Sequence, residues 1–93
     1  MSAARGGRFV EPLRAFIEER NLDGRATLSE DTPLLEWGVL DSLGLNELTL
    51  FVEERFALSV PAAAITADNF RDLRAIDALL RDLAGEAAPD GRP

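Results

Sequence analysis

The chain has 93 residues, which is enough for one small domain and no more. Its formal net charge is −7, from ten Arg, no Lys and seventeen Asp or Glu. Its 46% hydrophobic and 29% charged residues suit a folded soluble domain and exclude a disordered acidic tail. The absence of Cys and His excludes disulfides, Cys- or His-based metal sites, thiolate nucleophiles and the commonest general base. Nucleic acid is also excluded as a partner. Its binding depends on Lys and Arg contacts to phosphates, and phosphates repel a chain with this negative net charge.

The two ends of the chain, 1–8 and 85–93, lack apolar periodicity, and we expect them to be flexible termini around one domain over 9–84. No apolar run approaches the roughly 20 residues needed to cross a bilayer. The amino-terminal stretch has no hydrophobic signal core. The sequence therefore predicts a cytoplasmic protein without a membrane partner.

Apolar residues at helical spacing predict a first helix between Phe9 and Arg20. Four of them fall at offsets 0, 4, 7 and 8, namely Phe9, Leu13, Phe16 and Ile17. Pro12 is tolerated in the first turn, where its missing N–H has no helical partner, so we expect the helix to start near Glu11.

A long connection follows, because turn and cap residues interrupt the helical pattern from Asn21 to Asp41. A connection of this length in a compact domain is held in place by burying its own side chains. We expect five apolar residues to do this: Leu28, Leu34, Leu35, Trp37 and Val39.

Asp41 is expected to cap a second helix that runs to about Phe56. Its core stripe consists of Leu45, Leu48, Val52 and Phe56. Pro61 stops any continuation, and 65–69 has room for one short helical turn.

Helical periodicity resumes from 72 to 84, through Leu73, Ile76, Leu80 and Leu83. Asp72 and Asp77 are expected near or on the exposed side of this last helix. The short run 58–60 is read as a link and not a strand. The prediction is an all-α fold, a small four-helix bundle of three main helices and one short helix, with a long loop between the first two.

The run Gly38–Leu43 resembles the phosphopantetheine-attachment site of acyl and peptidyl carrier proteins. The resemblance extends upstream to the loop entry at 31–35 and downstream to Val52–Phe56 and Val60–Pro61. It also includes the closing helix, so that it covers about 9–83. The order of long loop, Asp-Ser, paired glutamates and Pro is more specific than the Asp-Ser-Leu tripeptide alone.

The resemblance implies a non-catalytic carrier whose Ser42 receives 4′-phosphopantetheine from coenzyme A. A separate Mg-dependent phosphopantetheinyl transferase installs the group, and Asp41 beside the modified Ser supports that reaction. The thiol of the arm then carries an acyl or aminoacyl thioester to cargo-loading and cargo-processing enzymes, such as adenylation, acyltransferase or tailoring enzymes. No catalytic residue and no metal ligand of the chain's own is implied, and the absence of Cys fits, since no side chain competes for cargo.

Two departures from carriers of fatty-acid synthesis concern the docking surface. Gly44 stands where those carriers have an acidic residue, and Ala62–Ala64 replaces an acidic helix. We therefore expect partners to dock through Leu43 and Leu50, with Glu47 as the one charged contact and Gly44 permitting close approach. Trp37 is interpreted as a core anchor, although its place near the base of the arm also permits contact with the cargo.

The local run Val39–Leu43 looks closer to stand-alone peptidyl or D-alanyl-type carriers and to carriers of secondary metabolism and natural-product biosynthesis. We expect a monomer. The alternative is an unmodified acidic helical module for protein–protein interaction, in which Asp41 and Ser42 only cap a helix. The cargo, the loading enzyme and the pathway are not encoded in this pattern, because partner enzymes select the thioester.

Overall fold

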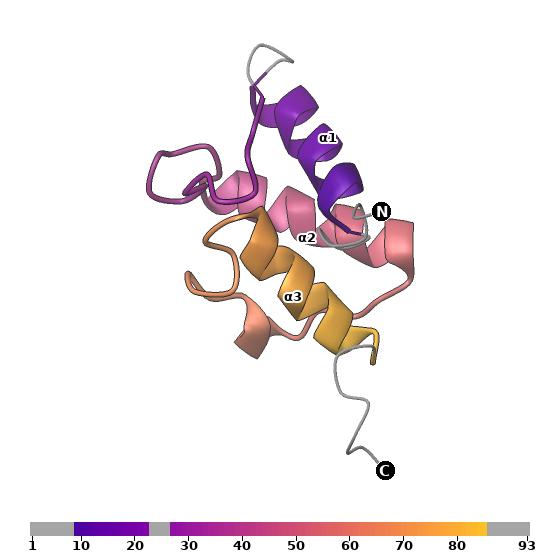
Figure 1. Ribbon diagram of the computed structural model, residues 1–93. Helices are drawn as coiled ribbons and strands as arrows, with labels where there is room; N and C mark the ends of the chain where they lie inside the picture. Colours follow the sequence, from indigo (N-terminus) through magenta and orange to yellow (C-terminus); the bar gives the residue numbers. More distant parts are fainter. Residues whose placement is uncertain (1–8, 23–26, 86–93) are drawn as a thin grey trace.

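The computed structural model describes residues 9–22 and 27–85, which form three α-helices and one 3-10 helix (Figure 1). In chain order these are α1 (Val10–Asn21), α2 (Ser42–Phe56), η2 (Ala62–Ala64) and α3 (Leu73–Leu83). No strand occurs in these residues, so the expected all-helical class is confirmed. The expected flexible ends fall outside the described residues, except for Gly85.

The expected count of four helices is not confirmed, because the short fourth element is a single 3-10 turn at Ala62–Ala64. The segment 67–70, which overlaps the range 65–69 where a short helix was expected, is a turn. Asn69 explains the difference: its carboxamide donates to the Ala64 carbonyl at 2.8 Å, and its backbone N–H donates to the Thr66 hydroxyl at 3.1 Å. Side chains that satisfy backbone groups in this way compete with helix formation.

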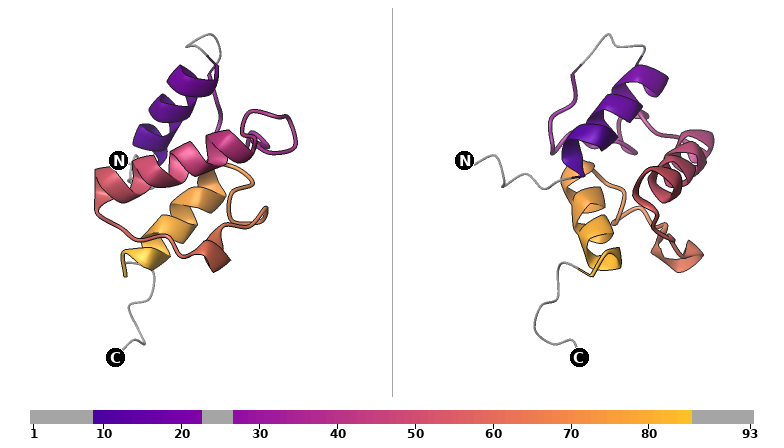
Figure 2. Two further views of the ribbon diagram at one scale, coloured as in Figure 1. Left: turned by 180° about the vertical axis from the view of Figure 1, so that it is seen from behind. Right: turned by 90° about the vertical axis from the view of Figure 1, so that its right-hand side faces the viewer.

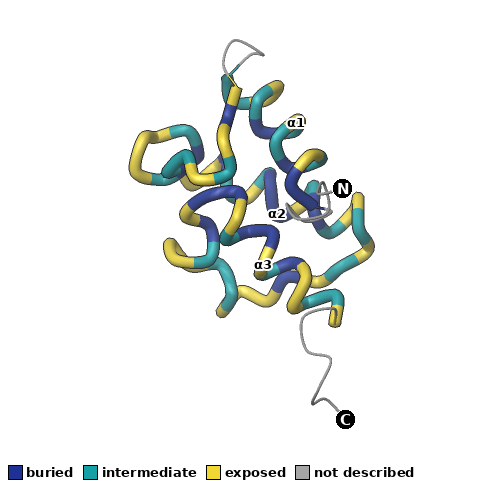
Figure 3. Tube along the Cα trace, in the orientation of Figure 1, coloured by how far each residue is buried: buried dark blue, intermediate teal, exposed yellow. Residues whose placement is uncertain are grey.

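The helix α2 runs across α1 and α3, which both lie on one side of it (Figure 1 and Figure 2). Each helix is buried where it faces the others and exposed on its outer side (Figure 3). The loops contribute to the same core through Leu28, Leu34, Leu40, Val60 and Phe70, all buried. The core stripe expected on α2 is confirmed at Leu48 and Val52, which are 0% and 1% exposed.

Two acidic residues belong to the folded core, although they were expected near or on the exposed side of the last helix. Asp72 caps α3, and Asp77 is only 5% exposed. An Asp77 carboxylate oxygen accepts the backbone N–H of Phe9 at 3.2 Å, which joins α3 to the start of α1. The expectation was wrong because Asp77 lies four residues after Leu73 and three before Leu80, on the face that packs inward.

Candidate functional site

The start of α2 displays a serine hydroxyl at a capped helix terminus. Asp41 has extended backbone angles (φ −113°, ψ −168°), and its carboxylate accepts the Gly44 N–H at 2.8 Å. This geometry confirms Asp41 as the cap, an interaction that stabilises a helix by about 1 kcal/mol. Ser42 is therefore the first helical residue, and it is exposed to solvent.

The same helix start favours an anion on the Ser42 oxygen. The backbone N–H groups of Ser42 and Leu43 lie in the first turn, where no carbonyl of the helix can accept them. The positive end of the helix dipole adds about 0.3–1 kcal/mol for a negative group at an exposed terminus. A phosphodiester on Ser42 fits this site. Its negative charge would lie near the unsatisfied N–H groups of the first turn, and solvent leaves room for the group.

The loop before the site is held from the α1 side. A Glu18 carboxylate oxygen accepts the backbone N–H of Leu28 at 2.7 Å. The Arg14 guanidinium donates to the Leu28 carbonyl at 3.0 Å. Leu28 is thereby fixed at both backbone groups while its side chain enters the core. The helical pattern of α1 places Glu18 and Arg14 off its core face, but it does not indicate which loop residue they reach.

The loop is also held from the segment that leads into α3. The Leu34 N–H donates to the Arg71 carbonyl at 2.8 Å, and the Arg74 N–H donates to the Glu30 carbonyl at 3.1 Å. The Arg74 guanidinium lies 3.5 Å from Glu30 and 3.3 Å from Asp31. These contacts span some forty positions of the chain, so the placement of the site depends on tertiary structure.

Trp37 does not anchor the loop, and that prediction was wrong. Its side chain is 69% exposed, whereas Leu34 and Leu40 on either side of it are buried. Leu35 and Val39 are half-buried and pack against the core, as expected. The segment 34–38 is a turn, in which the Trp37 N–H donates to the Pro33 carbonyl at 3.0 Å and residues 36–38 lie on the exposed outer side.

The expected docking residues lie on the outer side of α2. Leu43 and Leu50 are 65% and 55% exposed, so neither belongs to the core. Glu47 is not a free charge: its carboxylate accepts a hydrogen bond from the Arg20 guanidinium at 3.2 Å. Arg20 also lies over the Phe16 ring, 5.3 Å from its centroid. Arg20 thus offsets the charge of Glu47 on the outer side of α2.

Gly44 serves a contact within the molecule, which corrects the expectation that it lets a partner approach. It is buried, and a Cβ built at this position would lie 3.1 Å from the Asn21 side-chain nitrogen and 3.2 Å from an Asp41 carboxylate oxygen. The missing side chain therefore lets the end of α1 pack against the first turn of α2. An acidic side chain here would meet Asn21 and not solvent.

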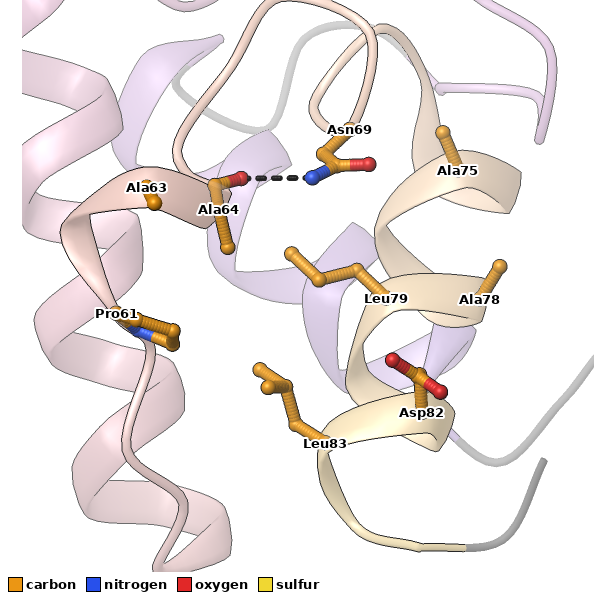
Figure 4. A pocket seen from close by; sticks show the side chains of 9 residues that line it. All are labelled: Pro61, Ala63, Ala64, Asn69, Ala75, Ala78, Leu79, Asp82 and Leu83. Atoms are coloured by element: carbon orange, nitrogen blue, oxygen red, sulfur yellow. Dashed lines mark hydrogen bonds between the residues drawn. The ribbon is translucent and has the colours of Figure 1, made fainter. Parts of the chain in front are cut away.

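A second exposed area lies between η2 and α3, where the side chains enclose an open hollow of about 630 Å³ (Figure 4). Four alanines and two leucines supply most of its lining: Ala63, Ala64, Ala75, Ala78, Leu79 and Leu83. Asp82 is the one ionisable residue in the lining. The Ala62–Ala64 segment therefore presents no charge to a partner, as the sequence indicates.

The described part of the chain holds neither a metal-binding cluster nor a membrane-spanning helix. No group of three or more acidic residues among 9–22 and 27–85 is placed to hold a metal ion. No helix in those ranges has the length and apolar character needed to cross a membrane.

Comparison with known proteins identifies what the chain resembles. Residues 13–76 match the family model described as "Phosphopantetheine attachment site". The chain is also 28% identical, over 81 residues, to Aminoacyl carrier protein 2 of Bradyrhizobium diazoefficiens. That alignment covers 87% of this chain and 88% of the relative. The matched family region contains the long loop, the start of α2 and the first residues of α3.

Proposed function

The chain belongs to the phosphopantetheine-attachment-site family, and from that premise we propose that Ser42 is the residue that carries the prosthetic group. As a member of this family the chain is a carrier protein and not an enzyme, and its cofactor is covalent 4′-phosphopantetheine. This membership favours the carrier over the unmodified interaction module. Its partners are a phosphopantetheinyl transferase and enzymes that process the cargo.

The observation that carries the proposal is the exposure of Ser42 at a capped helix start. The other described serines differ. The Ser29 hydroxyl lies 3.0 Å from the Thr32 hydroxyl in a hydrogen bond, and Ser59 lies in the link after α2. Ser42 therefore combines a solvent-facing oxygen with the unsatisfied N–H groups that favour a phosphodiester.

The transfer requires little from the carrier itself. The Ser42 oxygen attacks the β-phosphorus of coenzyme A, the bond from that phosphorus to the bridging oxygen breaks, and 3′,5′-adenosine diphosphate leaves. The hydroxyl proton passes to a base on the transferase. One Asp41 carboxylate oxygen accepts the Gly44 N–H, and we assign to the remaining oxygen a supporting contact to the transferase's Mg²⁺.

Intact mass measurement tests the attachment site. After incubation with coenzyme A, Mg²⁺ and a promiscuous phosphopantetheinyl transferase, we expect the mass of the full chain to rise by one phosphopantetheine. Proteolysis and peptide mapping should place the group on the peptide that contains Ser42. An unchanged mass, or the group on Ser29 or Ser59, contradicts the proposal.

We propose an amino acid as the cargo, joined as a thioester to the thiol of the arm. The support is the alignment with a relative named as an aminoacyl carrier protein, at 28% identity over most of both chains. The chain has no Cys, so the thiol of the arm is the only one available for this chemistry. A role in secondary metabolism stays a prediction from the resemblance at Val39–Leu43.

We propose that partners dock on the outer side of α2 through apolar contacts. A partner must bring its active site to Ser42, so the exposed surface beside Ser42 lies within the interface. Leu43 and Leu50 supply the apolar area there, while the charge of Glu47 is already paired with Arg20.

We expect Leu43→Ala and Leu50→Ala to slow pantetheine transfer more than Glu47→Gln does, with only weak inhibition by salt. Rim charges act mainly on the association rate, and salt screens them. The measurement is the initial rate of modification at several ionic strengths, with circular dichroism to check each fold. Unchanged rates in both Leu variants together with strong salt inhibition would indicate a charge-led interface.

A further inference from the structure

We propose that the phosphopantetheine arm on Ser42 rests against the exposed indole of Trp37 when no partner is bound. The inference depends on the proposed attachment at Ser42. Trp37 has the largest exposed fraction among the large apolar residues of the described ranges, 69%, and Leu43 follows with 65%. One of these residues lies on each side of Ser42 in the chain.

The exposure of Trp37 is imposed by its backbone. Its N–H donates to the Pro33 carbonyl at 3.0 Å, and the next N–H, from Gly38, donates to Leu35 at 3.1 Å. Gly38 has a φ of +76°, a left-handed conformation that other residues rarely adopt, and it ends the turn. This turn fixes the backbone at Trp37, and the indole it carries lies in solvent, 69% exposed.

The same turn brings Trp37 close to the attachment site. The Leu40 N–H donates to the Leu34 carbonyl at 3.1 Å, which closes the turn with Trp37 midway between its ends. Ser42 follows two residues after Leu40. Because a residue spans at most about 3.6 Å, the Cα atoms of Trp37 and Ser42 are separated by at most about 18 Å, and the closed turn shortens this. An extended arm has a comparable length.

The positions of the larger elements agree with this reach. Figure 1 and the left view of Figure 2 show that the later part of the loop between α1 and α2 projects beside the start of α2. The loop is tied to the rest of the fold by the Leu34 contact to Arg71 and by buried Leu28. Trp37 is therefore presented at a fixed place near the root of the arm.

The chemistry of the arm matches an indole. Next to its phosphate the arm carries a gem-dimethyl group, followed by amides, so it has both apolar and hydrogen-bonding parts. An indole offers a broad apolar face and one N–H donor. The covalent link also keeps the arm at a high effective concentration near Trp37, which a separate partner does not have. These points favour the arm over a partner protein as the group that covers the indole of Trp37.

Tryptophan fluorescence tests the contact directly, since the chain has one Trp and no Tyr. On conversion of the unmodified protein to the phosphopantetheine form, we expect the emission maximum to move to shorter wavelength. Acrylamide quenching of the emission should become weaker as the arm covers the ring. Nuclear Overhauser contacts between the gem-dimethyl protons and the indole protons should appear in the same sample.

Controls separate this inference from the attachment itself. Ser42→Ala treated with the same transferase and coenzyme A should show the spectrum of the unmodified protein. Ser59→Ala, an exposed position outside the proposed docking surface, should keep the fluorescence change. A mass increase without a change in emission, quenching or Overhauser contacts overturns the inference. No mass increase refutes the attachment proposal.

Discussion

Replacing Ser42 by Ala is expected to abolish pantetheine attachment completely while leaving the fold intact. The substitution removes the oxygen that the proposal assigns as the nucleophile. Stability should hardly change, because Ser42 is exposed, Ala is the best helix former, and the capping carboxylate of Asp41 remains in place. Intact mass after the transferase reaction measures the loss, and circular dichroism with a thermal melt measures the fold.

Ser59→Ala is the matched control, since Ser59 is also an exposed serine but lies in the link after α2. It should be modified as fast as the parent chain. Residual modification of Ser42→Ala at another hydroxyl would show that exposure at the helix start is not what selects the site. A Ser42→Ala protein that melts far below the parent would show that the hydroxyl also has a structural role.

Replacing Leu48 by Ala is expected to lower the free energy of unfolding by about 2–5 kcal/mol, the usual range for emptying a buried leucine site. Leu48 is 0% exposed, at the centre of the face that α2 turns toward the core. Small domains are stable by only about 5–15 kcal/mol, so this loss is a large part of the total. Denaturant unfolding followed by circular dichroism measures it.

Leu50→Ala is a close control for this experiment, because it makes the same chemical change two residues away on the same helix. Leu50 is 55% exposed, so its truncation leaves no cavity and should shift the midpoint little. Equal losses for the two variants would mean that the assigned inner and outer faces of α2 are wrong. The same Leu50→Ala protein then serves the docking experiment, with its fold already verified.

Local signals in the sequence predicted the bounds and the cap of α2 well. The end of α2 at Phe56 and its start after Asp41 both follow from local chemistry, because a cap and an apolar period act within a few residues. The exposure of Leu43 and Leu50 also follows from their position off the core stripe. The cap and the period place Ser42 at the exposed helix start, while its role as the attachment residue comes from the resemblance at Gly38–Leu43.

Predictions of whether a single side chain is buried or exposed were less accurate. Trp37 was expected inside because large apolar side chains usually are, but the turn closed by Leu34 and Leu40 points it outward. Asp77 was expected near or on the exposed side, but its carboxylate meets the Phe9 N–H, 68 positions away in the chain. The local pattern around Asp77 gives no sign of its contact with Phe9.

The sequence by itself determined the helical class, the capped start of α2 and the serine that stands there, because these depend on contacts within one or two turns of helix. Only the tertiary structure decided what the neighbouring side chains do. It paired Glu47 with Arg20, packed Gly44 against Asn21 and left Trp37 in solvent. Such outcomes depend on which distant surfaces compete for the same space, and periodicity describes one segment at a time.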